Sequence, residues 1–166
     1  MSQLLVPNGP NQTTAVFAKV TTGTNIKTML QIKPFNTCSI VAWGCSFDAS
    51  AAATPGMVEL IDTGTVFGTV TASADADIVK YDSVENAVAS IQGLTLGTSA
   101  TGYTCTSEGS ITVTRSFDLQ LIAPTNQYVR EFSLAARPKC IIGNAVRIRM
   151  HFGTAVNAAC WVLLQF

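Results

Sequence analysis

The chain has 166 residues, of which 48% are hydrophobic and 12% charged, and its formal net charge at pH 7 is +0. This charged content is about half that of an average soluble protein, and the length suits one domain with its own hydrophobic core. No run approaches the roughly 18 apolar residues that a membrane-spanning helix requires, and the neutral balance disfavours nucleic acid as a partner. We expect so apolar a chain to cover part of its surface by self-association.

The first element expected is an extended N-terminal arm, residues 1–15, followed by a single domain, residues 16–166. The start MSQLLVPNGPNQ has no basic stretch and contains two prolines, so it does not resemble a secretion signal. We expect the protein to be made in a cytoplasm and to leave it as part of a larger object. The apolar group Leu4, Leu5 and Val6 belongs either to a disordered terminus or to an arm that grips a neighbouring sheet or an underlying shell.

The elements after the arm are almost all strands. Short β-rich runs separated by Gly, Pro, Asn and Ser are typical of a sandwich or jelly roll. A hairpin is expected to turn at Glu108–Gly109, and residues 83–94 favour either a short helix or a loop. We therefore predict an all-β protein, a single jelly-roll-like antiparallel β-sandwich. The expected strands cover residues 25–33, 38–48, 57–64, 65–70, 78–81, 102–109, 110–124, 128–138, 140–143, 145–152 and 155–166.

One of these strands carries a row of cations. Residues 144–152 read NAVRIRMHF, in which apolar residues alternate with Arg147, Arg149 and the chain's single histidine, His151. Alternation with period two puts the three cationic residues on the face opposite the core. Three interpretations stay open for the two arginines: plain solvent exposure, an ion pair with a neighbouring copy, or contact with a polyanion.

Charge is unevenly distributed along the chain. Residues 1–47 hold three lysines and no acid, residues 48–118 hold nine acids against two cations, and residues 132–166 hold four cations and no acid. These segments can neutralise one another within a chain or between copies, which favours assembly. The acidic side chains that could meet the two arginines of a neighbouring copy are Asp75, Asp77, Asp82, Glu85 and Glu131.

The last strand, ending in ACWVLLQF, is apolar on both faces. Because a terminus frays unless it is tied down, we expect this strand to lie centrally in a sheet with both faces covered. Removing Trp161 to Phe166 is then expected to unfold the domain.

The sequence offers little chemistry. A catalytic triad would have only His151 as its base, and no phosphate-binding glycine loop is present. Glu59 with Asp62 has no pattern that supports glycoside hydrolysis. The acidic residues Asp75, Asp77, Asp82 and Glu85 are weak candidates for a metal, since apolar residues interrupt them where a calcium loop needs oxygen ligands. We expect no enzyme and no cofactor.

The five cysteines are expected to be free and buried, because their number is odd, no CxxC pair occurs and most lie in apolar runs.

Three segments carry a resemblance: PGMVELIDTGTV (55–66), residues 102–134, and AVRIRMHFGTAVNAACWVLLQF (145–166). Together they resemble small β-sandwich proteins of tailed-bacteriophage virions, similar to head-decoration or minor head components. The resemblance implies a single jelly roll that trimerises on the outside of a capsid, with the major capsid or another virion protein as partner and no catalytic role. The chain lacks the acidic ending expected of such proteins.

A second contact is suggested by Tyr128 and Arg130, since tyrosine and arginine are enriched at protein interfaces. A half-buried strand position is the alternative for Tyr128. Two other functions also stay open. A glycan- or receptor-binding module would use exposed aromatic residues, for which Tyr81, Tyr103 and Tyr128 remain. A shell protein of a non-tailed virus would be expected to carry a basic arm, and this arm has no cation before Lys19.

Overall fold

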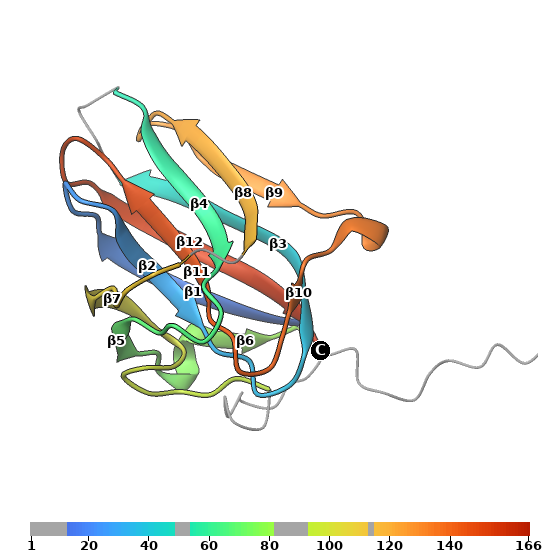
Figure 1. Cartoon of the computed structure of the whole chain (residues 1–166). Helices are drawn as coiled ribbons and strands as arrows, with labels where there is room; N and C mark the ends of the chain where they lie inside the picture. Colours follow the sequence, from blue (N-terminus) through green and yellow to red (C-terminus); the bar gives the residue numbers. More distant parts are fainter. Residues whose placement is uncertain (1–12, 49–53, 82–92, 113–114) are drawn as a thin grey trace, which may run out of the picture.

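The computed structural model describes residues 13–48, 54–81, 93–112 and 115–166, and in them the chain forms two antiparallel sheets packed face to face (Figure 1). The predicted all-β sandwich is confirmed. Short 3₁₀ helices at Asp75–Asp77 and Leu134–Ala136 are the helical elements of these ranges. The strands are β1 (Thr13–Thr21), β2 (Lys27–Ile32), β3 (Cys38–Asp48), β4 (Gly56–Asp62), β5 (Thr69–Ala72), β6 (Ile78–Lys80), β7 (Gly102–Ser107), β8 (Arg115–Ile122), β9 (Tyr128–Glu131), β10 (Lys139–Cys140), β11 (Val146–His151) and β12 (Asn157–Gln165).

The strand order mixes early and late strands in both sheets. In sheet A the order is β6, β1, β12, β3, and both β9 and β10 pair with the far side of β3. In sheet B the order is β5, β7, β2, β11, β4, β8. The chain crosses from one sheet to the other at most of its turns, so the two sheets enclose one core. No helix among the described residues is long and apolar enough to cross a membrane.

The core lies between the sheets and is built by alternation. Every second residue of β11 and of β12 points inward, and these positions hold aliphatic side chains and a cysteine that are almost fully buried. Such burial contributes roughly 25 cal/mol per Å² of apolar surface. The fully buried hydrophobic side chains include Trp43, Phe152, Met29, Leu30, Ile32, Ile40, Leu60, Ile61, Leu94, Ile148 and Met150.

β12 has the central position that its composition predicts. It pairs along its whole length with β1 on one side and with β3 on the other. The expectation that both of its faces are covered is not met within the described residues, because Trp161 and Leu163 point away from the core and are only half-buried. A strand can therefore be tied down by its two neighbours while one of its faces stays partly open.

Several elements differ from the prediction. The chain from Glu108 to Gly109 does not close a hairpin, because β7 pairs with β2 and β5 whereas β8 pairs with β4. The sequence analysis also missed β1, whose threonines weaken its apolar alternation and which begins at Thr13, inside the predicted arm. The strand predicted at 65–70 is irregular until β5 begins at Thr69, and of the strand predicted at 140–143 only Cys140 is in a strand, β10. The arm residues Leu4, Leu5 and Val6 and the helix candidate at 83–94, except its last two residues, lie outside the described residues.

Candidate functional site

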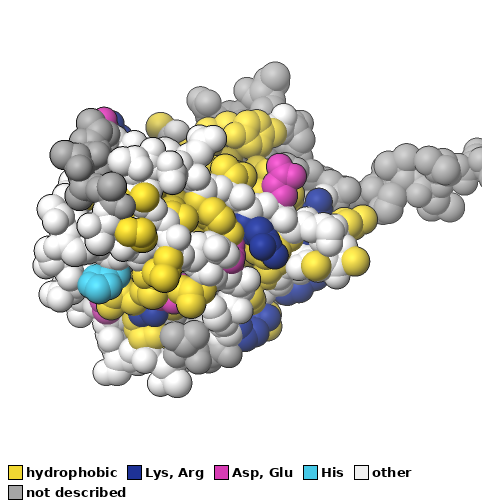
Figure 2. Space-filling model, turned by 90° about the horizontal axis from the view of Figure 1, so that it is seen from above, with side chains coloured by type: hydrophobic (Ala, Val, Ile, Leu, Met, Phe, Trp, Pro, Cys, Tyr) yellow, Lys and Arg dark blue, Asp and Glu magenta, His cyan; other side chains and the backbone are white. Residues whose placement is uncertain are grey.

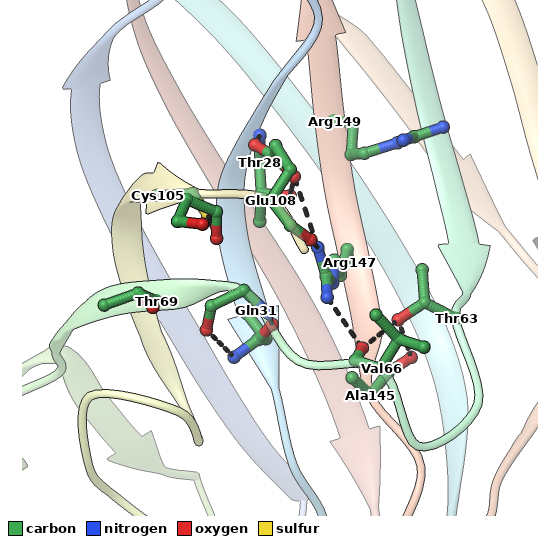
Figure 3. Close-up of polar contacts among 12 residues, drawn as sticks. Thr28, Gln31, Thr63, Val66, Thr69, Cys105, Glu108, Ala145, Arg147 and Arg149 are labelled. Atoms are coloured by element: carbon green, nitrogen blue, oxygen red, sulfur yellow. Dashed lines mark hydrogen bonds and ion pairs between the residues drawn. The ribbon is translucent and has the colours of Figure 1, made fainter. Parts of the chain in front are cut away.

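Arg147 is buried beneath its own chain. It lies with Arg149 and His151 on the outer side of sheet B, as the alternation predicts, yet its side chain is 0% exposed. It donates to the carbonyl oxygen of Val66 at 2.6 Å and to the carbonyl and carboxylate oxygens of Glu108 at 3.0 and 3.2 Å (Figure 3). An acidic partner was expected on a neighbouring copy. The acidic partner in the structure is instead Glu108 of the same chain. Arg147 therefore has no surface to offer another protein, which corrects its predicted interface role.

Polar side chains of β2 hold the covering segments in place. The Glu108 carboxylate accepts hydrogen bonds from the backbone N–H and the hydroxyl of Thr28, each at 2.6 Å. The Gln31 side chain accepts from the N–H of Gly68 at 2.8 Å and donates to the carbonyl of Ala100 at 2.7 Å. Three loop segments, at Gly68, Ala100 and Glu108, are thereby fastened to the outside of sheet B. Figure 3 shows Thr28 and Gln31 on β2 with Glu108 beside Arg147. This fastening explains why Glu108 is not the tip of a hairpin.

Arg149 and His151 of β11 are also engaged within the chain. Arg149 donates from Nε to the Glu59 carboxylate at 2.6 Å, and both side chains are only 11% exposed. His151 is exposed, with Nε2 3.1 Å from the carbonyl oxygen of Thr24. Arg147, Arg149 and His151 therefore all make their contacts within the same chain.

Tyr128 and Arg130, the second predicted contact, differ in their surroundings. The Tyr128 hydroxyl donates to the Asp118 carboxylate at 2.6 Å, and the Trp43 indole N–H donates to the same oxygen at 3.1 Å. Because Asp118 is on β8 of sheet B, these bonds link the two sheets at one edge. Arg130 is exposed, with its guanidinium 5.6 Å from the ring centroid of Phe132. Tyr128 is thus mainly a structural residue, whereas Arg130 is open to solvent.

The carboxylates considered for glycoside hydrolysis do not converge. Asp62 is fully buried on the core side of β4, where it pairs with Arg115 and accepts from the N–H of Gly64 at 2.8 Å. Glu59 is on the opposite side of the same strand, paired with Arg149. Each carboxylate therefore has its own arginine and no shared space with the other.

The weak metal candidates gain no support. Asp75 lies in an exposed 3₁₀ turn, Asp77 accepts there from the N–H of Ala74 at 3.0 Å, and Asp82 and Glu85 lie outside the described residues. Within the described ranges no three His, Cys, Asp or Glu side chains are grouped so that they could hold a metal ion.

All five cysteines are free and buried, as predicted. Cys45 lies directly opposite Cys160, and Cys38 directly opposite Cys140, on strands that flank β3. Burial raises the pKa of the Cys45 thiol to about 12 and raises that of Cys160 as well. These thiols are therefore protonated core side chains at neutral pH.

The outer side of sheet A is apolar, and we call it face A. Directly opposed residues of antiparallel strands point to the same side of a sheet, so the register defines which residues share this face. Face A consists of two adjacent rows, Phe17–Trp161–Gly44–Val129 and Val79–Ala15–Leu163–Ala42–Glu131.

Face A exposes large apolar side chains to solvent. Phe17 and Val79 are each 39% exposed and Val129 is 51% exposed. Near the centre the Trp161 ring lies over Gly44, where a Cβ atom would come within 2.8 Å of it. A glycine at this position lets the indole lie flat on the sheet. The only charged residue in the two rows is Glu131.

Polar groups surround face A. At one end Lys19 and Asp48 form an exposed ion pair at 3.8 Å. At the other end Arg137 donates to the Gln165 side chain, and the Lys139 ammonium donates to the Ser39 hydroxyl at 2.8 Å. An apolar centre with a polar rim is the usual anatomy of a protein–protein interface.

A smaller apolar group lies on β8, on the other side of the sandwich. Leu119 is 54% exposed and Leu121 is 74% exposed, opposite Glu59 and Met57 of β4. Seen from above, hydrophobic side chains are open to solvent among polar ones (Figure 2). This group lies on one strand, whereas face A, described above, spans four.

The aromatic residues considered for glycan binding do not form a platform. Tyr81 is 63% exposed, Tyr103 packs against the core and Tyr128 is held by Asp118. The three tyrosines therefore do not together present one exposed aromatic surface.

No protein-family model, curated protein or solved structure matches this chain. Its function must therefore be argued from the surfaces just described. Face A was missed in the sequence analysis, although one signal pointed to it: the last strand is apolar on both faces, and only one of them can belong to the core.

Proposed function

We propose that this chain is a non-enzymatic structural protein of a virion, a capsid-decoration or minor head protein that associates with copies of itself on the particle surface. The observation that supports self-association is face A, where Phe17, Trp161 and Val129 expose apolar surface across four strands, and the virion role rests on the resemblance of the sequence to decoration proteins. An apolar patch of this kind on a soluble protein marks an interaction surface.

The energetics favour covering face A. Removing apolar surface from water contributes about 25 cal/mol per Å², against the cost of ordering two molecules. The rows hold one carboxylate, so almost no charge must be desolvated when a partner packs there. A contact of this composition is expected to persist in high salt, because hydrophobic association does not depend on screened charges.

The strand order supports a jelly roll as the scaffold. Eight strands follow the order β1, β12, β3, β9 in one sheet and β2, β11, β4, β8 in the other, with the first and last strands side by side. We infer that these strands form two interlocked Greek keys, the arrangement of viral jelly rolls. β5, β6, β7 and β10 are additions outside these eight strands.

The test is the absolute mass of the purified chain, measured by size exclusion with light scattering at low and high salt. The account expects a salt-resistant multiple of 17.5 kDa, and the resemblance to decoration proteins predicts three copies. A mass of one chain at every concentration and salt would remove preformed self-association. Labelling of virus particles with an antibody against the chain tests the virion location separately, and unlabelled particles would overturn it.

A further inference from the structure

We infer that the partner of face A is a second copy of this chain, with Lys19 of one copy placed against Glu131 of the other. This inference rests on the proposed self-association and specifies its surface, its central residue and its charged contact. It follows from how charge and apolar area are arranged on face A.

The two flanks of face A carry opposite charges. Lys19 is on β1 and its side chain is 73% exposed, whereas Glu131 is on β9 and is also exposed. Lys19 reaches Asp48 only through a solvent-exposed pair at 3.8 Å, and no described residue forms an ion pair with Glu131. Each flank therefore has a charge available for a partner, and a copy of the same face supplies both complementary charges.

The register places these charges symmetrically about the centre of the face. From β1 to β9 the sheet steps through β12 and β3, and the row of Lys19 lies four residues along the strands from the row of Glu131. With strands about 4.8 Å apart and a rise of about 3.4 Å per residue, the two Cα atoms are about 20 Å apart. Their midpoint falls between Trp161 and Gly44.

This symmetry selects a copy of the chain as the occupant. In a twofold pair, an axis through that midpoint brings Lys19 of each copy to Glu131 of the other and places both Trp161 rings together. In a closed ring of three, the β1 flank of one copy meets the β9 flank of the next, which pairs the same charges without laying face A on face A. In the twofold pair the apolar rows of both copies are covered and Trp161 lies between the charged flanks, where interface hot spots concentrate. An unrelated partner has no reason to match this spacing.

Charge reversal provides the sharpest experiment. We would measure the dissociation constant by light scattering over a dilution series for the wild type, Lys19→Glu, Glu131→Lys and the double variant that carries both. Each single reversal is expected to weaken association by about tenfold, because a rim attraction becomes a repulsion. The double variant restores the opposite charges and is expected to return to within about threefold of the wild type.

Apolar variants test the centre of the same contact. Trp161→Ala and Val129→Ser are each expected to weaken association by at least about tenfold. Val129 is half-exposed on an edge strand, so its variant serves if Trp161→Ala does not fold. Leu121→Ser is the matched control: it makes the same kind of change at a more exposed apolar residue on the other side of the sandwich, and it is expected to leave the dissociation constant unchanged.

The outcomes separate the inference from the proposed function. An oligomer that tolerates the Val129 variant, or a double reversal no better than the worse single reversal, would overturn the inference and leave self-association through another surface. A wild type that is a monomer at every concentration would overturn both. Loss of association on Leu121→Ser but not on Val129→Ser would assign the contact to β8 instead.

Discussion

The outer sides of the two sheets differ in what covers them. Over β2 and β11, sheet B covers its outer side with its own loops, which are held by Arg147, Gln31 and Thr28. Sheet A leaves Phe17, Trp161 and Val129 on its outer side, with no described segment over them. Polar side chains on the back of a sheet can thus fasten the chain to itself, whereas apolar ones remain available to a partner.

The comparison also reverses the first interpretation of the two surfaces. Cations on the back of β11 suggested an interface, yet Arg147 is fully buried within one chain. The last strand suggested pure core, yet Trp161 is on face A. Charge in a sequence therefore does not identify an interface unless the loops that lie over it are known.

The largest expected effect is deletion of Trp161–Phe166. β12 pairs with both β1 and β3, and its inward residues belong to the core. We expect the free energy lost with this half of β12 to exceed the roughly 5–15 kcal/mol by which a typical domain is stable. The β-sheet circular-dichroism signal and cooperative unfolding should then be lost. A native-like spectrum with a sharp transition would contradict the central role given to β12.

Arg147→Ala tests the covered side of sheet B. The variant leaves the Glu108 carboxylate and the Val66 carbonyl without their buried donor, and breaking such a pair costs about 3–5 kcal/mol. Urea unfolding measures the change. Arg130→Ala is the control, since its exposed side chain is expected to matter by less than about 0.5 kcal/mol. Equal effects of the two variants would show that Arg147 does not hold the loops.

Acid is expected to weaken the fold through two buried carboxylates. Burial raises the pKa of both Asp62 and Asp118, but hydrogen bonds from their partners outweigh it, so that the pKa of each lies below its ordinary value of 3.8. A depressed carboxylate stabilises the fold above its unfolded pKa, and that contribution is lost as the pH falls through the folded value. The urea midpoint should therefore fall in acid, and less steeply in Asp62→Asn than in the wild type. Parallel pH profiles would contradict this assignment.

Tyr128→Phe is expected to have the smallest effect. It removes one hydrogen bond to Asp118, which keeps those from Trp43 and Gln120, and the net cost of such a bond is about 1 kcal/mol. Tyr81→Phe, at a more exposed tyrosine, is the control and should be neutral. Burial and the adjacent Asp118 carboxylate also raise the pKa of Tyr128 to about 12. An ultraviolet titration should therefore show this phenol ionising at a higher pH than an exposed tyrosine.

Much of the fold could be predicted from local pattern. The alternation of β11 gave the correct facing of Arg147, and the two-sided apolar composition of β12 gave its central position. The absence of a hairpin at Glu108 could not be predicted from nearby residues. Thr28 and Arg147, which bind the Glu108 carboxylate and carbonyl, lie 80 and 39 positions away in the sequence. Face A is likewise a product of register: Phe17, Trp161 and Val129 are unremarkable in sequence and become neighbours only through pairing across four strands.

Hydroxyl-radical footprinting of the wild type, read by mass spectrometry, tests the central claim most directly. The account predicts that Trp161, Phe17 and Val129 are protected at concentrations where the chain is associated and become oxidised on dilution to single chains. Leu121, on the other side of the sandwich, should be oxidised equally in both states. Equal oxidation of Trp161 in the associated and dissociated protein would contradict the claim that face A is where copies of this chain meet.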